Sequence, residues 1–362
     1  MTSRAMPNKN VEGFLKQTDI FVSGREGYRT YRIPAIVVST KGTILAFCEG
    51  RRYSQADYGD IDIVLRRSFD DGKSWQPIQV VADDGPNTMG NPSPVVDQKT
   101  GTIWLPLCKN NIQVYVMKSA DDGATWSSPI EITRHVRREG WYWYATSPCH
   151  GIQLKNGKLV IPCDHQEGPR TPSMMNCYSH IIYSDDHGSS WRLGGTVGPY
   201  TDECTVVQRC DGSLYLNMRN YNPDHGNVRA YACSEDDGMT WSEIRFDETL
   251  IEPRCQASAV RFTETNSNDR NRVLFSNPAS QERAEMTVRL SYDECQNWTI
   301  SKMLHSGPSA YSDLAVASDM TICCLYERGE KSPYEKITFA SFNIEWLTDG
   351  ADHISTQMPN RH

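Results

Sequence analysis

The sequence predicts an all-β protein, and three observations point to a six-bladed β-propeller. The eight residues SFDDGKSW, which begin at position 68, recur as SADDGATW at 119, SDDHGSSW at 184 and SEDDGMTW at 234. A degenerate fifth copy, SYDECQNW, begins at 291. Repeats of about this length are typical of propellers and other arrays. The segments between copies resemble short β-strands, and helical spacing is nearly absent. About 70 residues follow the last copy, which is enough for a sixth blade after five marked ones.

The expected strands are β-branched or aromatic runs bounded by Gly, Asn, Asp or Pro. In chain order they occupy residues 31–39, 42–50, 60–68, 101–109, 112–119, 157–164, 179–184, 212–219, 229–234, 272–276, 286–291, 313–318, 321–327 and 335–346. Roughly four strands per repeat is the content of one propeller blade. We expect a further strand near residues 18–23 to join the C-terminal strands and close the ring.

The chain is expected to form one domain. Length alone would suggest two domains of about 150 residues each. Because the repeat continues through the chain, we expect one domain instead. Residues 1–17 are expected to be a partly disordered N-terminal extension, residues 18–350 a single propeller, and residues 351–362 a C-terminal tail.

The repeated motif has two interpretations. Paired acidic residues before a glycine resemble a metal-binding loop, but none of the copies has the alternating oxygen ligands and closing glutamate of an EF-hand. Asp-x-Gly instead forms a turn, in which Ser, Thr and Asp side chains bond nearby backbone and Trp packs onto a core. We interpret the repeats as structural hairpin turns and assign them no chemistry.

Composition excludes several classes of function. A net charge of −8 argues against nucleic acid as a partner and requires that any anionic ligand be held by a local cluster of arginines. The 12 cysteines include no CxxC pair, and the 9 histidines do not fall at zinc-ligand spacing from them, so no metal site is expected. Buried, reduced thiols are the expected state, which favours a reducing compartment.

Neither a membrane span nor a signal peptide is expected. No apolar run approaches about 18 residues, and the opening MTSRAMPNKN lacks an apolar h-region. The cellular location stays open: it would be cytoplasmic for the sequence as it stands, and secreted or periplasmic if a signal peptide has been removed. The oligomeric state stays open.

A propeller binds its ligand at one mouth of the central channel, so the residues of one site are expected far apart in the sequence. Arg32 stands out because it lies inside an apolar strand, directly before Ile-Pro. Arg219 in LYLNMRN and Arg283 in SQERAEMTVRL are of the same kind. Taken singly, each arginine is more simply a solvated residue on a strand face.

Taken together, the fragments resemble the sialidase (exo-α-neuraminidase) family along nearly the whole chain. The matching fragments are YRIP at 31–34, the repeated motifs, which that family calls Asp boxes, DEC at 202–204, LNMR at 216–219, QERAEMTV at 281–288, AYSDL at 310–314 and LYE at 325–327. Asp boxes alone occur in unrelated propellers. Their combination with YRIP, a downstream arginine pair and a late Tyr-Ser-Asp is specific.

The resemblance implies a substrate, namely a terminal sialic acid or other nonulosonic acid on a glycan or glycoconjugate. Its anomeric carbon bears a carboxylate, which three guanidiniums hold by charge-assisted hydrogen bonds better than lysines would. By motif match these are Arg32, Arg219 and Arg283. Glu327 matches the acidic residue that orients the first arginine, and its alternative interpretation is a surface salt bridge.

The resemblance also implies a tyrosine nucleophile. An anionic Asp or Glu would approach an anionic centre, whereas a neutral phenol avoids that repulsion, and sialidases are the Tyr-nucleophile exception among glycosidases. Tyr311 in SAYSDL is the match, and Glu203 in YTDECTVV matches the base that a phenol needs near neutral pH. Without the motif, Tyr311 would be one of 17 tyrosines and best interpreted as packed in a strand.

Asp57 is the match for the acid/base residue that protonates the leaving oxygen. Asp60 and Asp62 compete for this role, but alternation in DIDIVLR places them within or beside a strand, whereas Asp57 lies in a Gly-flanked loop. Arg51 matches an arginine that faces the ring-hydroxyl side of the sugar, with Arg52 as the neighbouring alternative.

These roles imply a retaining exo-α-sialidase that works through a covalent glycosyl-tyrosine and needs no metal or organic cofactor. The alternatives are transfer of the sugar to another acceptor, a variant nonulosonic acid as substrate, and an inactive glycan-binding propeller. An inactive propeller would be expected to lack some of the site residues, and none is missing.

One segment departs from the family pattern. The run WYWYATSPCHGIQL at 141–154 carries Ser147 and Cys149 where the family has glycines on both sides of the proline. Glycine adopts positive φ at little cost and other residues resist it, so the loop is expected to follow a different path, and the exact sugar stays open. The aromatic cluster 141–144 is either a wall for the N-acyl or glycerol arm or a packed hairpin.

Overall fold

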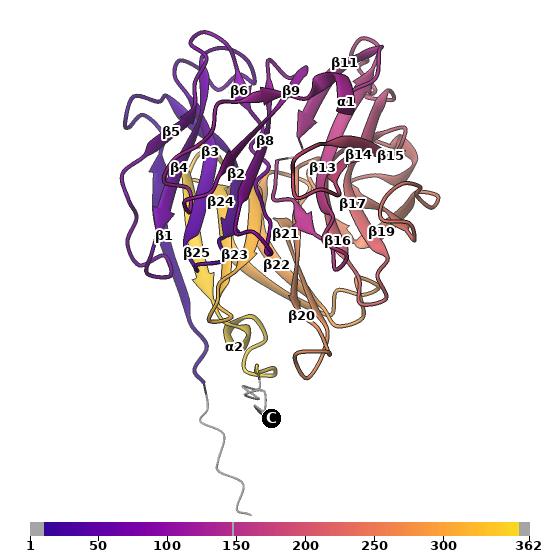
Figure 1. Cartoon of the computed structure of the whole chain (residues 1–362). Coiled ribbons are helices and arrows are strands. Elements are labelled where there is room, and N and C mark those ends of the chain that lie inside the picture. Colours follow the sequence, from indigo (N-terminus) through magenta and orange to yellow (C-terminus); the bar gives the residue numbers. More distant parts are fainter. Residues whose placement is uncertain (1–10, 147, 355–362) are drawn as a thin grey trace, which may run out of the picture.

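The computed structural model describes residues 11–146 and 148–354, and its regular structure is almost wholly antiparallel β (Figure 1). The first blade contains β2 (Thr30–Val38), β3 (Ile44–Arg51), β4 (Ile61–Ser68) and β5 (Gln79–Ala82). The second contains β6 (Met89–Gly90), β7 (Val95–Val96), β8 (Ile103–Lys109), β9 (Gln113–Ser119) and β10 (Ile130–Glu131). The third contains β11 (Trp141–Thr146), β12 (Ile152–Gln153), β13 (Leu159–Glu167), β14 (Cys177–Ser184) and β15 (Arg192–Val197). The fourth contains β16 (Thr201–Gln208), β17 (Leu214–Asn220), β18 (Val228–Ser234) and β19 (Arg245–Ile251).

The rest of the chain forms one sheet of seven strands in the order β1-β25-β24-β23-β22-β21-β20. Its strands are β1 (Leu15–Val22), β20 (Ser258–Thr263), β21 (Arg272–Pro278), β22 (Ala284–Ser291), β23 (Ile300–Val316), β24 (Ile322–Arg328) and β25 (Lys336–Phe342). The helices are one-turn elements, namely α1 (Thr133–Val136), α2 (Ile344–Leu347) and a 3₁₀ turn (Pro223–His225). Over the described ranges, no helix has the length and apolar character that crossing a membrane requires.

The innermost strands of the sheets surround a central channel. β7 contacts β2 and β12, β16 contacts β13 and β20, and β23 contacts both β20 and β2. Because the last contact joins the end of the chain to its beginning, the sheets form a closed radial arrangement. Closure of this kind is a β-propeller, the fold that the sequence predicts.

The prediction of six separate blades is wrong. The structure has four separate blades of four or five strands each and a fifth sheet of seven strands. The reason is the length of β23, which has 17 residues. Its first half pairs with β22 and its second half with β24, so two strand groups that the repeat marks separately are joined into one sheet.

An N-terminal strand closes the last sheet, as predicted. β1 pairs antiparallel with β25, from Leu15 opposite Phe342 to Val22 opposite Lys336. This strand begins at Leu15 rather than near residue 18. Beyond residue 350, buried Asp352 pairs with Arg272 at 2.6 Å.

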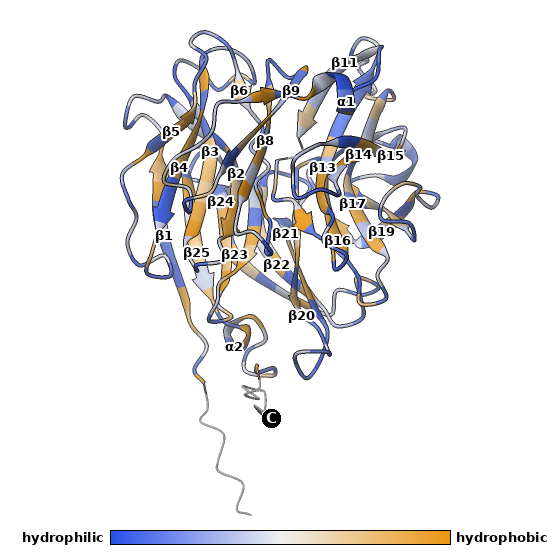
Figure 2. Cartoon of the chain, in the orientation of Figure 1, coloured by the Kyte–Doolittle hydropathy of each residue, from blue (hydrophilic) through white to orange (hydrophobic). Residues whose placement is uncertain are grey.

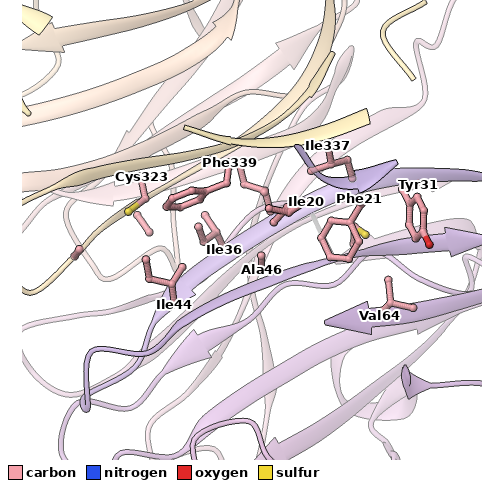
Figure 3. Close-up of a cluster of buried hydrophobic side chains, with 14 of the residues drawn as sticks. Ile20, Phe21, Tyr31, Ile36, Ile44, Ala46, Val64, Cys323, Ile337 and Phe339 are labelled. Carbon is pink, nitrogen blue, oxygen red and sulfur yellow. The ribbon is translucent and has the colours of Figure 1, made fainter. Parts of the chain in front are cut away.

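The core consists of apolar side chains that pack between neighbouring sheets. Figure 3 shows one cluster, in which Phe21 of β1 and Phe339 of β25 lie with Ile36 of β2 and Ala46 of β3. Figure 2 shows that hydrophobic residues gather in the strands and hydrophilic ones in the loops. The strand ends and loops are therefore the places where polar groups can serve a ligand.

The first Asp box forms a hydrogen-bonded turn at the end of β4. Ser68 Oγ donates to Asp70 Oδ1 at 2.8 Å and accepts from the Gly72 N–H at 2.8 Å. Asp70 also accepts from the hydroxyl and the N–H of Ser74. The other copies, including the degenerate one, repeat the first two bonds. The polar groups of the motif are thus occupied in holding the turn.

Glycine is required in this turn by both conformation and space. Gly72 has φ of +80°, and a Cβ there would lie 2.2 Å from the Phe339 ring of β25. Trp75 packs edge-on against the same ring, with 5.0 Å between centroids. The first Asp box therefore fixes the first blade to the neighbouring sheet.

The Asp boxes predict a loss of stability in acid. Hydrogen bonds from Ser74 and Ser68 lower the pKa of Asp70 from its ordinary 3.8 to about 2. A carboxyl with a lowered pKa in the folded state stabilises the fold above its unfolded-state pKa, and that contribution is lost as pH falls toward the folded-state pKa. Asp70→Asn is therefore expected to reduce the dependence of the unfolding free energy on pH between about 4 and 2.

Urea unfolding across that pH range measures the effect. Asp71→Asn is the matched control, because Asp71 lies in the same turn and makes only a loose contact with Lys73 at 3.7 Å. If the two variants show the same pH dependence, the hydrogen bonds of Asp70 do not stabilise the fold.

Candidate active site

Seven of the eight predicted site residues line one cavity of about 380 Å³. They come from the first blade, the fourth blade and the seven-stranded sheet, and they are Arg32, Arg51, Asp57, Glu203, Arg219, Arg283 and Tyr311. The eighth, Glu327, is buried behind Arg32. The closed ring of sheets thus brings together residues up to about 280 positions apart in the chain.

A β-bulge in β2 lies next to Arg32. The pairing of β2 with β3 shifts between Arg32 and Ala35, and Ile33 has φ of +61°. Positive φ strains a β-branched residue, and Pro34 lacks the N–H that the strand ladder would use. The Ile33 N–H instead donates to Glu327 Oε1 at 2.9 Å, which offsets part of the strain. Bulges of this kind re-aim side chains next to functional sites.

Glu327 connects Arg32 with the strand that carries Tyr311. Its carboxylate pairs with Arg32 Nε at 2.7 Å and accepts the Tyr311 backbone N–H at 3.1 Å. The exposed fractions of the Arg32 and Glu327 side chains are 7% and 0%. The pair is buried, so the alternative interpretation of Glu327 as a surface salt bridge is wrong.

The hydroxyl of Tyr311 donates a hydrogen bond to Glu203 Oε1. Arg219 Nη1 lies 2.8 Å from Glu203 Oε2 and 3.3 Å from the Tyr311 hydroxyl, so one guanidinium contacts both groups. Burial and the charge of Glu203 raise the pKa of Tyr311 well above its ordinary value, although Arg219 and Arg283 act in the opposite direction. The phenol is therefore protonated and has a carboxylate placed to accept its proton.

Arg32 and Arg283 lie on the ring of Tyr311. The Cζ atoms of the two arginines are 5.2 and 5.4 Å from the ring centroid. Arg283 Nη1 bonds the Tyr334 hydroxyl at 2.7 Å, and the Tyr334 ring lies 4.1 Å from Arg32 Cζ. Tyr334 was not predicted. It lies in the polar segment KSPYEK, where no strand pattern or motif marks it.

Arg51 links Asp57 to the protein interior. Its Nε and Nη2 donate to Glu49 Oε2 at 2.9 and 2.6 Å, and its Nη1 lies 2.9 Å from Asp57 Oδ1. Arg51 is buried, whereas 67% of the Asp57 side chain is exposed. Asp57 therefore lies at the open side of the cavity.

Asp60 and Asp62, the competing candidates, do not line the cavity. Arg52 pairs with them at 2.9 and 2.6 Å, and Asp62 also accepts from the Tyr28 hydroxyl at 2.6 Å. β4 begins at Ile61, so the alternation argument placed both aspartates correctly. Arg52 is likewise outside the cavity, which favours Arg51.

Besides Glu49, two further carboxyls in the cavity wall were not predicted. Asp164 of β13 and Asp202 of β16 are both buried. Burial and the charge of Asp202 raise the pKa of Asp164 well above its ordinary value, and burial also raises the pKa of Asp202. A protonated carboxyl can donate a hydrogen bond as well as accept one, so this pair can bind sugar hydroxyls. The two residues belong to different blades, and no local sequence pattern links them.

The aromatic run of β11 contributes one residue to the cavity, Trp143. Trp141 stacks on His165 with 3.4 Å between ring centroids, Tyr144 is buried, and Tyr142 is 61% exposed. Most of this run is therefore the packed hairpin of the second interpretation.

Only one of the two residues that depart from the family pattern can be located in the structure. Ser147 lies outside the described residues, whereas Cys149 is buried and its carbonyl accepts from the Ser93 hydroxyl at 2.7 Å.

The arrangement places three guanidiniums in one wall of the cavity, a protonated phenol beside a carboxylate, and a second carboxyl group at the open side. Throughout residues 11–146 and 148–354, no group of three or more His, Cys, Asp or Glu residues is placed to hold a metal ion. Within the described residues, the cysteines other than Cys204 are free thiols. A hydrogen-bonded phenol and carboxylate next to guanidiniums have the groups that nucleophilic and acid/base chemistry on an anion would use.

Comparison with known proteins gives related sequences along most of the chain. Residues 42–324 match the family described as BNR repeat-like domain. A sialidase of Micromonospora viridifaciens is 32% identical over 373 residues, which cover 93% of this chain and 55% of the relative. An exo-alpha-sialidase of Aspergillus fumigatus is 32% identical over 377 residues, which cover 90% of this chain and 87% of the relative. The chain thus spans about half the length of the first relative and most of the second.

Solved structures share the fold. The Hadza microbial sialidase Hz136 has a TM-score of 0.83 at 30% identity, covering 92% of this chain and 69% of that one. The intramolecular trans-sialidase from Ruminococcus gnavus, solved with oseltamivir carboxylate, has a TM-score of 0.77 at 17% identity, covering 91% of this chain and 98% of that one. At the lower identity, the likeness shows the propeller fold alone.

Proposed function

Because the chain belongs to the sialidase family, we propose that it is a retaining exo-α-sialidase, which releases terminal sialic acid from glycoconjugates through a covalent glycosyl-tyrosine. One observation carries the proposal: the Tyr311 phenol contacts Glu203 and lies among three guanidiniums in a single cavity. We propose that the propeller itself is the catalytic unit and that its partners are sialylated glycans.

Arg32, Arg219 and Arg283 are proposed to hold the substrate carboxylate. Guanidiniums offer paired donors that match the two oxygens of a carboxylate. Each of the three is already held by a partner within the protein. Groups fixed before the substrate arrives lose little conformational entropy on binding, so the clamp is pre-organised.

Tyr311 is proposed to attack the anomeric carbon. Its raised pKa means that the free phenol is a weak nucleophile, and it must transfer its proton as the new bond forms. Glu203 already accepts a hydrogen bond from that hydroxyl and is the acceptor of the proton. Arg219 contacts both groups and stabilises the negative charge that they share during the transfer.

Asp57 is proposed to donate a proton to the departing oxygen and then to remove one from the attacking water. Two displacements at the anomeric carbon give overall retention of configuration. The position of Asp57 at the open side suits both steps, since the leaving alcohol and the incoming water use the same path. The Arg51 contact at 2.9 Å holds the carboxyl near the cavity before the substrate binds.

Hydrolysis of a fluorogenic α-sialoside by the purified protein tests the proposed activity. Proton NMR of the first product is expected to show the α-anomer, which later equilibrates. A panel of glycosides that differ at C5 of the sugar, assayed in the same way, identifies the preferred nonulosonic acid. A folded protein that turns over none of these glycosides is not a sialidase.

Asp57→Ala is expected to lower kcat/KM on a sialyl-disaccharide by about 10²- to 10⁴-fold, because general acid assistance to a poor leaving group is lost. The loss on an aryl sialoside with a good leaving group is expected to be much smaller, since that group departs without a proton. Asp60→Ala is the matched control, because Asp60 pairs with Arg52 outside the cavity. Equal losses on the two substrates would remove Asp57 from the acid role.

A further inference from the structure

The loop that carries Asp57 is anchored at one end and leaves that carboxyl largely exposed. Residues 52–60 connect β3 to β4. The Gly59 N–H donates to the Thr88 hydroxyl at 3.0 Å, and the same hydroxyl donates to the Gly59 carbonyl at 3.0 Å. A general acid works only when it is held within hydrogen-bond distance of the atom that it protonates. The contacts that hold Asp57 therefore decide whether this loop can serve the proposed reaction.

Asn111, from the second blade, holds the backbone of Asp57. Its Nδ2 donates to the Asp57 carbonyl at 2.9 Å, and its side chain is buried. Asn111 lies in the tight turn between β8 and β9, where Asn110 and Asn111 have φ of +53° and +52°. Asparagine and glycine are favoured at two such positions of a hairpin turn. The turn thus places a buried amide of one blade against the acid loop of its neighbour.

Five residues that line the catalytic cavity form a closed cycle of contacts around Asp57. Glu49 Oε2 accepts from Arg51 Nη2 at 2.6 Å, and Arg51 Nη1 lies 2.9 Å from Asp57 Oδ1. The Asp57 carbonyl accepts from Asn111, whose Oδ1 accepts from Asn91 Nδ2 at 2.9 Å. The cycle closes where the Asn91 N–H donates to Glu49 Oε1 at 2.9 Å. Asp57 is therefore held at its side chain through Arg51 and at its backbone through Asn111.

The cycle is anchored in the protein interior. Glu49, Asn91 and Asn111 are all buried. A Cβ at Gly90 would lie 2.5 Å from Glu49 Oε1, so a larger residue there would displace the carboxylate that accepts the Asn91 N–H. Both ends of the Asn111 amide are bonded, one to Asn91 and the other to Asp57, which fixes the orientation of the amide. Asp57 is thus held in place before a substrate arrives.

We propose that Asn111 is a positioning residue for the acid/base step, which fixes the backbone of Asp57 so that its carboxyl stays within reach of the leaving oxygen. The inference rests on the proposed function, because Asn111 acts on the reaction only through Asp57. The amide itself transfers no proton. Because proton transfer is sensitive to small displacements, loss of the Asn111 contact is expected to cost rate without removing the acid.

Asn111→Gly tests the proposal. Glycine adopts positive φ readily and keeps the carbonyl that accepts the Tyr144 N–H at 2.8 Å, so the turn is retained and only the amide is lost. The variant is expected to lower kcat/KM on a sialyl-disaccharide by about tenfold or more. On an aryl sialoside, whose leaving group departs without a proton, the loss is expected to be about twofold or less.

Asn110→Gly is the matched control, because Asn110 has the same φ in the same turn. Its side chain bonds Asn87 and the Thr88 N–H, and among the described residues it makes no hydrogen bond to the loop 52–60. The Asn110 N–H, which glycine keeps, still donates to the Thr88 carbonyl at 2.9 Å. Both substrates are expected to react within about twofold of the parent rate. If the two Asn→Gly variants lose activity equally, the Asn111 amide has no positioning role.

A double-mutant cycle with Asp57→Ala separates positioning from a general loosening of the fold. When residue 57 is already alanine, Asn111→Gly is expected to change kcat/KM by no more than about twofold. An equal loss in both backgrounds, or an equal loss on the two substrates, would overturn the proposal. In that case the parent protein still hydrolyses both sialosides and the proposed function stands. A parent protein that turns over no sialoside would overturn the proposed function and this inference with it.

Discussion

Tyr311→Phe is expected to lower kcat/KM by about 10³-fold or more, because it removes the oxygen that we propose attacks the anomeric carbon. The ring stays in place between Arg32 and Arg283, so substrate binding is expected to change little. Glu203 also keeps its ion pair with Arg219 at 2.8 Å. The loss is therefore expected in kcat, with KM within about tenfold of the parent value.

Tyr334→Phe is the matched control for this variant. It also removes a phenol hydroxyl that bonds an arginine of the clamp, Arg283, but that hydroxyl has no contact with Glu203. Its loss is expected to cost about one hydrogen bond, which corresponds to about tenfold or less in kcat/KM. If the two Tyr→Phe variants lose activity equally, the Tyr311 oxygen has no special role.

Glu327→Leu is expected to lower the free energy of unfolding by about 3–5 kcal/mol, because it leaves the buried Arg32 charge without a partner. The change also removes the acceptor for the Ile33 and Tyr311 backbone N–H groups. Any folded fraction is expected to have weak activity, since the same carboxylate positions Arg32 and the strand that carries Tyr311. Urea unfolding at neutral pH measures the stability.

Glu26→Leu is the control for the loss of an ion pair. Glu26 pairs with Arg66 at 2.6 Å, but 38% of its side chain is exposed, so water screens the charges. Its cost is expected to be about 1 kcal/mol or less. If Glu327→Leu lowers the free energy of unfolding no more than Glu26→Leu does, burial does not make the ion pair of Arg32 and Glu327 more stabilising than an exposed one.

The propeller fold could be predicted because its signal is repeated. Each Asp box marks the turn at the end of one strand, and the turn chemistry of Ser68, Asp70 and Gly72 is local enough to be visible in eight residues. The number of blades could not be predicted in the same way. Gly307 and Pro308, which usually mark a break in a strand, lie where the partner of β23 changes from β22 to β24, yet β23 continues through them and joins the two strand groups.

The candidate site could be predicted only where a motif marks it. Asp57 was distinguished from Asp60 and Asp62 because the alternation of the strand fixes which residues lie in the loop. Tyr334 and Asp164 carry no such mark. They line the cavity because the closed ring places them beside residues from other parts of the chain. One sequence alone does not show contacts between residues that lie far apart in the chain and carry no motif.

The central claim is that Tyr311 is the nucleophile, and covalent trapping tests it most directly. A 2,3-difluoro derivative of sialic acid slows the second displacement and allows the intermediate to accumulate on the protein. Intact-protein mass spectrometry followed by peptide mapping is expected to find one glycosyl group per chain, on Tyr311, and none on Tyr311→Phe. An adduct on Glu203 or Asp57, or efficient turnover with inversion and no adduct, would contradict the account.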